Sequence, residues 1–136
     1  MPLDQVSYSN QMSNQGILIL EDEMIIAMDI RTVLEQIGYN IVGTVATAAD
    51  AISIAENSRI DLMIVDYRLR GPLNGEEAAS AIRSHSKRNI PVIFVSGTGD
   101  LELRNRLADD PCAFLKKPIK FEGLIQCIQS LLKPET

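Results

Sequence analysis

The sequence predicts an α/β protein, a doubly wound (βα)5 domain with helices on both faces of a five-stranded parallel sheet. Short runs of β-branched and other apolar residues alternate with longer segments of helical period. Each short run is nearly continuous in apolar residues, as expected of strands covered on both faces. With 136 residues, 46% of them hydrophobic, the chain can bury one sizeable core but is too short for two ordinary domains.

The chain divides into a tail and a domain. Residues 1–15 are rich in Ser, Asn and Gln and show no apolar periodicity, so burial cannot offset their ordering entropy. We therefore expect a flexible tail over residues 1–15 and one domain over residues 16–136.

Five apolar runs are expected to form the strands. They are Ile17–Leu20, Ile41–Val45, Leu62–Val65, Pro91–Val95 and Ala113–Leu115. Ligands of doubly wound sheets bind outside the carboxyl ends of such strands.

The segments between these runs have helical period. In the first, apolar residues recur at i, i+4, i+7 and i+11, namely Ile26, Ile30, Val33 and Ile37, and Gly38 is placed to end the helix. Thr47, followed three residues later by Asp50, predicts a capping box for the second helix.

Three more helices complete the pattern. Gly75–Ser84 supplies the third, and Leu101–Ala108 the fourth, which has the weakest apolar face and should be the least firmly packed. A clear apolar stripe from Phe121 to Leu132 predicts the last helix, with Pro134 beyond its end.

Composition limits the classes of partner. A net charge of -5 at pH 7 argues against a nucleic-acid or anionic-membrane surface, since both would repel the chain's average field. Cys112 and Cys127 lack the spacing of a zinc site or disulfide framework and are expected to be small core residues. With no signal segment or membrane-spanning run, a reduced cytoplasmic setting is expected.

Polar residues follow four of the predicted strands at their carboxyl ends. They are Glu21 and Asp22 after the first, Asp66 after the third, Ser96 after the fourth, and Lys116 or Lys117 after the fifth. Two carboxylates about 4 Å apart repel by roughly 4 kcal/mol at an effective dielectric near 20, so a bound cation is expected among the three acids. Oxygen ligands favour Mg²⁺ over zinc. The single histidine, His85, lies late in the third helix and is expected to be solvated.

Four segments resemble the signature segments of the receiver domains of bacterial two-component response regulators. They read ILILED, ending at Asp22; LMIVD, ending at Asp66; VIFVSG, containing Ser96; and FLKKP, containing Lys117. The resemblance spans Gly16 to about Leu132 and implies the flavodoxin-like strand order 2-1-3-4-5. It also implies a signalling domain rather than an enzyme, phosphorylated by a sensor histidine kinase or a histidine phosphotransfer protein.

The resemblance assigns a role to each site residue. Asp66 would accept the phosphoryl group, and Asp22 and Asp66 would bind Mg²⁺ (or Mn²⁺) directly. Glu21 would act through water, and the backbone carbonyl of Arg68 would complete the protein's metal ligands.

The same resemblance assigns the switch residues. Lys117 would pair with a phosphoryl oxygen. It is preferred over Lys116 because it directly precedes Pro118, and the family holds the corresponding Lys–Pro peptide bond in cis. Ser96 would hydrogen-bond the phosphoryl group, and Phe114 would turn inward as the Ser96 loop moves. Ordinary core packing of Phe114 remains an equal alternative.

Two stretches depart from the family pattern. The loop from Asp66 to Gly75 is one residue longer than usual, and Arg70-Gly71-Pro72 replaces a proline four residues after the acceptor. The segment from Ser96 to Lys117 is one residue shorter than usual. Both changes concern the shape of the partner face rather than the chemistry.

Three other functional classes share parts of this pattern. A phosphatase of the haloacid dehalogenase type needs an acid two residues after its Asp nucleophile, where this chain has Arg68. A flavodoxin-like cofactor binder would present hydroxyls and amides to a phosphate, which Glu21-Asp22-Glu23 would repel. A phosphorylation-independent interaction module with the same fold remains the main alternative.

The downstream role stays open. The domain could relay phosphate to a phosphotransfer protein, or bind a downstream target protein through the face of the fourth helix, fifth strand and fifth helix. No output domain is expected after the last helix, although the residues could also be a piece of a longer regulator.

Overall fold

The strands form one parallel sheet in the predicted order. The computed structural model describes residues 15–97 and 112–132, and its sheet has the order β2-β1-β3-β4-β5. The strands are β1 (Gly16–Leu20), β2 (Asn40–Val45), β3 (Leu62–Asp66), β4 (Val92–Ser96) and β5 (Cys112–Lys116). All five predicted strands and the predicted fold class are therefore confirmed.

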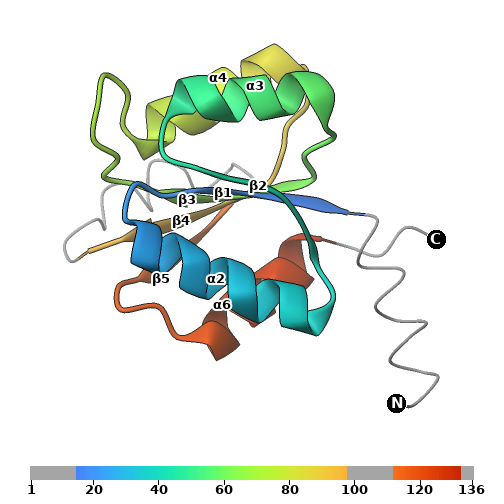
Figure 1. The fold of residues 1–136 in the computed structure, drawn as a ribbon, viewed down its shortest axis with the longest axis vertical. Coiled ribbons are helices and arrows are strands. Elements are labelled where there is room, and N and C mark those ends of the chain that lie inside the picture. Colours follow the sequence, from blue (N-terminus) through green and yellow to red (C-terminus); the bar gives the residue numbers. More distant parts are fainter. Residues whose placement is uncertain (1–14, 98–111, 133–136) are drawn as a thin grey trace.

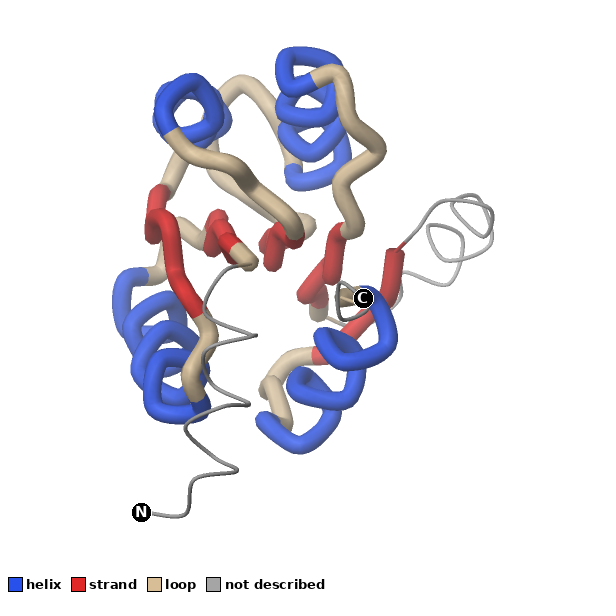
Figure 2. The backbone as a smooth tube through the Cα atoms, turned by 90° about the vertical axis from the view of Figure 1, so that its right-hand side faces the viewer, coloured by secondary structure: helices blue, strands red, loops and turns tan. Residues whose placement is uncertain are grey.

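Helices cover both faces of the sheet. In the described ranges these are α2 (Met24–Ile37), α3 (Ala48–Asn57), α4 (Gly75–Ser86) and α6 (Phe121–Leu131). Figure 1 shows α3 and α4 on one side of the sheet and α2 and α6 on the other, and the turned view in Figure 2 shows the same three layers. The predicted fourth helix, Leu101–Ala108, and the predicted tail lie outside the described residues, apart from Gln15.

Alternate side chains of each strand belong to two separate hydrophobic cores, one on each face of the sheet. Ile17 and Ile19 pack with α2 and α6, whereas Leu18 and Leu20 pack with α3 and α4. Because successive strand residues point to opposite faces, a strand between two helical layers must be apolar at every position. This is the reason why the strand sequences show continuous rather than alternating hydrophobicity.

The helix ends follow the sequence signals with one correction. Gly38 ends α2 in the left-handed conformation, with φ of 115°, as predicted. At Thr47 the side chain accepts a hydrogen bond from the Asp50 backbone N–H, but the structure shows the reciprocal pair of a full capping box at Asn74 and Glu77, at the start of α4. Asp50 has a shorter side chain than the Glu of the usual motif, which explains why only half of the predicted box forms.

A buried carboxylate joins β1 to β3 at the amino ends of the strands. Asp61 accepts hydrogen bonds from the Gly16 backbone N–H at 2.8 Å, from Arg59 Nε at 2.8 Å and from Arg88 Nη2 at 3.1 Å. Burial would raise the pKa of Asp61, but the hydrogen bonds from Arg59, Gly16 and Arg88 outweigh it and hold the pKa below its usual 3.8. The sequence analysis did not identify this cluster.

Helix length and composition bear on membrane insertion. Among the helices that the structure describes, none combines the length and the apolar character needed to cross a bilayer.

We expect Asp61→Ala to lower the free energy of unfolding by about 2–4 kcal/mol at neutral pH, because it leaves the buried Gly16 N–H without its acceptor and leaves Arg88 with only its hydrogen bond to the Ile60 carbonyl among those described. Urea denaturation measures this loss. The pKa of Asp61 is lowered on folding, so its contribution is present above pH 3.8 and fades as the pH falls below that value. Arg59→Ala removes an arginine whose side chain is 68% exposed and should cost less than about 1 kcal/mol. Equal losses in the two variants would contradict this account.

Candidate metal and phosphoryl site

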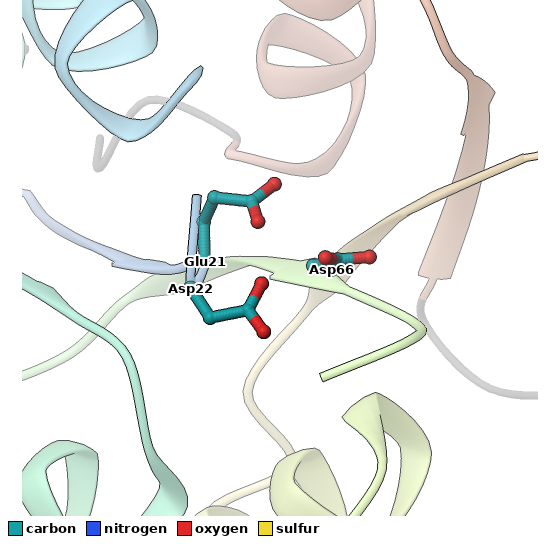
Figure 3. A group of neighbouring side chains, drawn as sticks. All are labelled: Glu21, Asp22 and Asp66. Atoms are coloured by element: carbon teal, nitrogen blue, oxygen red, sulfur yellow. The ribbon is translucent and has the colours of Figure 1, made fainter. Parts of the chain in front are cut away.

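Three carboxylates converge at the carboxyl edge of the sheet. Glu21 and Asp22 follow the last residue of β1, and Asp66 is the last residue of β3. One oxygen from each lies within 4.8 Å of the others, and Figure 3 shows the Glu21 and Asp22 side chains reaching toward Asp66. β1 and β3 are hydrogen-bonded neighbours, so the sheet itself brings these acids together, as the sequence analysis predicted.

Two of these acids are withdrawn from solvent. The side chains of Glu21 and Asp66 are only 3% and 4% exposed. Asp66 Oδ1 accepts a hydrogen bond from the Arg68 backbone N–H at 3.0 Å, and Glu21 Oε2 accepts one from the Glu23 backbone N–H at 3.0 Å. Backbone donors thus fix one oxygen of each buried carboxylate and leave the other facing the shared pocket.

Lys117, directly after β5, supplies the countercharge. Its Nζ lies 3.4 Å from Asp66 Oδ2, 3.5 Å from Glu21 Oε1 and 3.6 Å from Glu23 Oε1. Burial lowers the pKa of Lys117, but attraction to Asp66 and Glu21 outweighs it and leaves the pKa raised. Lys117 therefore stays protonated while it contacts three acids. Lys116, the other candidate, is exposed.

The backbone aims Lys117 at the acids. The Lys117 N–H donates to the Ser96 carbonyl at 2.8 Å, and the peptide bond between Lys117 and Pro118 is cis, as the family resemblance implied. Ser96 is buried at the end of β4, paired in register with Lys116. The ends of β4 and β5 are thereby joined beside the acidic cluster.

Glu21 holds its proton more tightly than an ordinary carboxyl group. Burial, and to a lesser degree Asp66, raises the pKa of Glu21 from 4.5 to about 7, despite the lowering effects of the Glu23 N–H and Lys117. Loss of solvation is therefore the main cost of placing Glu21 here, and the negative charge of Asp66 adds to it.

The donor set fits a hard divalent cation. Magnesium binds oxygen at about 2.0–2.1 Å, so opposite ligands of one ion lie about 4.2 Å apart. The three acidic oxygens are gathered within 4.8 Å, a spacing that small side-chain rotations would close. Their all-oxygen chemistry suits Mg²⁺ or Mn²⁺ and not zinc.

The remaining predicted residues lie around this pocket or away from it. Phe114 is half-buried and stacks on Phe94, with ring centroids 5.7 Å apart. Arg68 is exposed beside Asp66. His85 is exposed on α4, 3.9 Å from Glu56, and Cys127 is partly buried against the core. The side chain of Cys112 is outside the described residues.

Sequence reasoning missed three features of the site. Glu23 contacts Lys117, and Arg70 contacts Asp22. A side chain on Gly75 would overlap the Asp66 carbonyl oxygen, so α4 begins directly against the end of β3 and only glycine fits there. Gly75 could have been suspected from its place just before a helix, but the other two contacts leave no sequence signal.

Comparisons with known proteins agree with this geometry. Residues 17–129 match the family model for the response regulator receiver domain. The transcriptional regulatory protein PdtaR of Mycobacterium tuberculosis (strain CDC 1551 / Oshkosh) is 35% identical over 114 residues, which are 83% of this chain and 54% of that protein. The chain thus spans about half the length of this curated relative.

Solved structures give the same result. The signal receiver domain of a modulated diguanylate cyclase from Desulfovibrio desulfuricans G20 is 31% identical, with a TM-score of 0.74 over 85% of this chain and 91% of that one. The receiver domain of the sensor histidine kinase PA1611 from Pseudomonas aeruginosa PAO1 is 28% identical, with a TM-score of 0.70 over 86% of this chain and 96% of that one. That domain was solved with a magnesium ion coordinated in its active site cleft.

A doubly wound domain with this strand order and an acidic cluster at its carboxyl edge is the arrangement expected of a signalling receiver. The chain belongs to the response regulator receiver family of two-component signal transduction, which confirms the resemblance seen in the sequence.

We expect Glu21→Gln to change how the stability of the metal-free protein depends on pH. The folded-state pKa of Glu21 is raised from 4.5 to about 7, so its favourable contribution is present below pH 4.5 and is lost as the pH rises through 7. Wild type should therefore lose up to about 3 kcal/mol relative to Glu21→Gln over that range. Urea denaturation in a metal chelator measures the difference. Parallel pH profiles would show that Glu21 is not perturbed.

Proposed function

We propose that this protein accepts a phosphoryl group on Asp66 from a phosphohistidine of a sensor histidine kinase or a histidine phosphotransfer protein. The observation that carries the proposal is the environment of Asp66. Its carboxylate is buried at a strand end, one oxygen is held by the Arg68 N–H, and the other faces Lys117 at 3.4 Å. A carboxylate held in this way presents a fixed nucleophilic oxygen beside a fixed cation.

The transfer needs positioning and charge neutralisation rather than acid–base chemistry. A bond forms between an Asp66 carboxylate oxygen and phosphorus as the phosphorus–nitrogen bond of the donor breaks, and that electron pair stays on the imidazole. Lys117 would form an ion pair with a phosphoryl oxygen as negative charge develops there, and the Ser96 hydroxyl would donate a hydrogen bond to another phosphoryl oxygen. Nothing in this reaction makes the protein an enzyme for an external substrate.

Mg²⁺, or Mn²⁺ in its place, would be the cofactor. Asp22 and Asp66 would bind it directly, Glu21 through water, and Arg68 through its backbone carbonyl. Bound there, the cation would neutralise the acids so that an anionic donor can approach an anionic nucleophile.

The consequence of phosphorylation would be a changed partner face. Ser96 and Phe114 are the proposed switch residues. Ser96 lies at the site, and its register partner in β5 is Lys116, two residues after Phe114. The stacking of Phe114 on Phe94 is equally consistent with ordinary core packing. Phe114 would have that role in a phosphorylation-independent interaction module. A cytoplasmic location and a downstream target protein follow from the signalling role. No direct contact with nucleic acid is proposed.

Asp66→Asn should abolish labelling by acetyl phosphate in Mg²⁺, and should abolish the NMR shifts that beryllofluoride causes in wild type. Intact mass spectrometry would detect the added phosphoryl group. Asp29→Asn, on the exposed side of α2, removes the same charge away from the pocket and should label as wild type does. An unlabelled wild type would favour the interaction module, and a labelled Asp66→Asn would show that another residue is the acceptor.

An exposed apolar patch beside the pocket fits the protein donor. Met24, Ile25 and Met28, at the start of α2, are 70%, 79% and 49% exposed. Their helix begins directly after Glu23, which contacts Lys117. A donor protein that brings its phosphohistidine to Asp66 must cover this flank, and an apolar patch there offers it contact area.

Ile25→Asp should slow phosphotransfer from a phosphorylated kinase or phosphotransfer protein by roughly tenfold or more, and should leave labelling by acetyl phosphate unchanged. Both rates can be followed with radiolabelled phosphate. Ala49→Asp adds the same charge at an exposed position of α3, which covers the other face of the sheet, and serves as the matched control. If Ile25→Asp slowed transfer from the phosphorylated protein and from acetyl phosphate equally, the substitution would affect the chemistry and not the docking of the donor.

A further inference from the structure

The lengthened loop between β3 and α4 is held at several points. The Gly75 N–H donates to the Tyr67 carbonyl at 2.8 Å and closes the base of the loop. Leu69 is buried in the core of α3 and α4. Gly71 has φ of 104°, a conformation that favours glycine. Arg70, between Leu69 and Gly71, is therefore placed by its neighbours.

Arg70 is directed at Asp22, one of the proposed metal ligands. Its backbone N–H donates to Asp22 Oδ2 at 3.1 Å, and its side-chain Nε lies 3.6 Å from the same oxygen. The Asp22 side chain is 13% exposed, whereas that of Arg70 is 87% exposed. A single residue of the loop thus brings both a backbone donor and a positive charge to one oxygen of the acidic cluster.

The positive charge of Arg70 conflicts with a divalent ion on the same carboxylate. A cation bound to Asp22 would lie within about 6 Å of the guanidinium, where like charges repel, and it would draw electron density from the oxygen that Arg70 uses. Each of the two cations must therefore weaken the binding of the other to Asp22, because coupling between two binding events is reciprocal.

We propose that Arg70 is an internal competitor of the divalent cation for Asp22, so that the loop lowers the metal affinity and is released when metal binds. The inference rests on the proposed function, since it assumes that Asp22 is a metal ligand. Arg70 would act through Asp22 and would not touch the reacting groups, and its place beside Asp22 depends on the β3–α4 loop of this chain. Metal binding would then change the β3–α4 loop before any phosphoryl group arrives.

Titration with Mg²⁺ alone tests the proposal in the unphosphorylated full chain. Isothermal calorimetry at low ionic strength should give a Kd roughly two- to fivefold lower for Arg70→Gln than for wild type, the range of an exposed ion pair. Arg70→Lys keeps the charge and should fall between them. The advantage of Arg70→Gln should shrink as added salt screens the pair. Arg31→Gln, which removes the same charge from a residue paired with Glu35 on α2, should bind as wild type does.

Backbone NMR provides a second readout. The Arg70 amide signal should move in step with Mg²⁺ binding in wild type, because its acceptor is engaged by the metal. Equal Kd values for wild type and Arg70→Gln, or an Arg70 amide that ignores Mg²⁺, would overturn the competition while leaving phosphorylation of Asp66 intact. A wild type that binds no Mg²⁺ would overturn both the competition and the proposed metal site.

Discussion

The organisation of the site depends on placing three carboxylates, two of them buried, at one edge of the sheet. The pairing of β1 with β3 fixes Glu21, Asp22 and Asp66 at this edge, and Glu21 and Asp66 are almost fully buried. Burial of apolar side chains on both faces of the sheet provides the free energy for this arrangement. The raised pKa of Glu21, caused first by burial and then by Asp66, shows that the local hydrogen bonds and countercharge do not offset these costs.

Much of the architecture could be predicted because it depends on features repeated along the chain. Continuous apolar runs such as Leu62–Val65 identify strands, since a strand between two layers tolerates no polar face. Gly38 marks a helix end through its own conformational freedom. The strand-end rule for doubly wound sheets then places Asp22 and Asp66 together without any knowledge of side-chain contacts. The family resemblance added the choice of Lys117 over Lys116, which periodicity left open.

The unpredicted features are contacts between residues whose pairing depends on loop geometry. Arg70 meets Asp22 across 48 positions of sequence, and Arg88 meets Asp61 across 27. A single sequence gives no sign that two such residues are partners, because each looks like a solvated charge. The capping boxes are different, because Asn74 followed three residues later by Glu77 is itself a readable helix-start pattern. This pair forms both hydrogen bonds of the box, whereas at Thr47 the structure shows one of the two.

The two internal cations at the site differ in how permanently they are held. Lys117 is anchored by its backbone hydrogen bond to Ser96 and contacts three carboxylates at once, so removing its charge would leave buried acids uncompensated. Arg70 meets one acid from a largely exposed position, where solvent replaces its contacts at little cost. An incoming divalent ion would therefore displace Arg70 but not Lys117. In the proposed reaction this difference would leave Lys117 in place to meet the phosphoryl group and would confine the exchange of charge to the Asp22 side of the site.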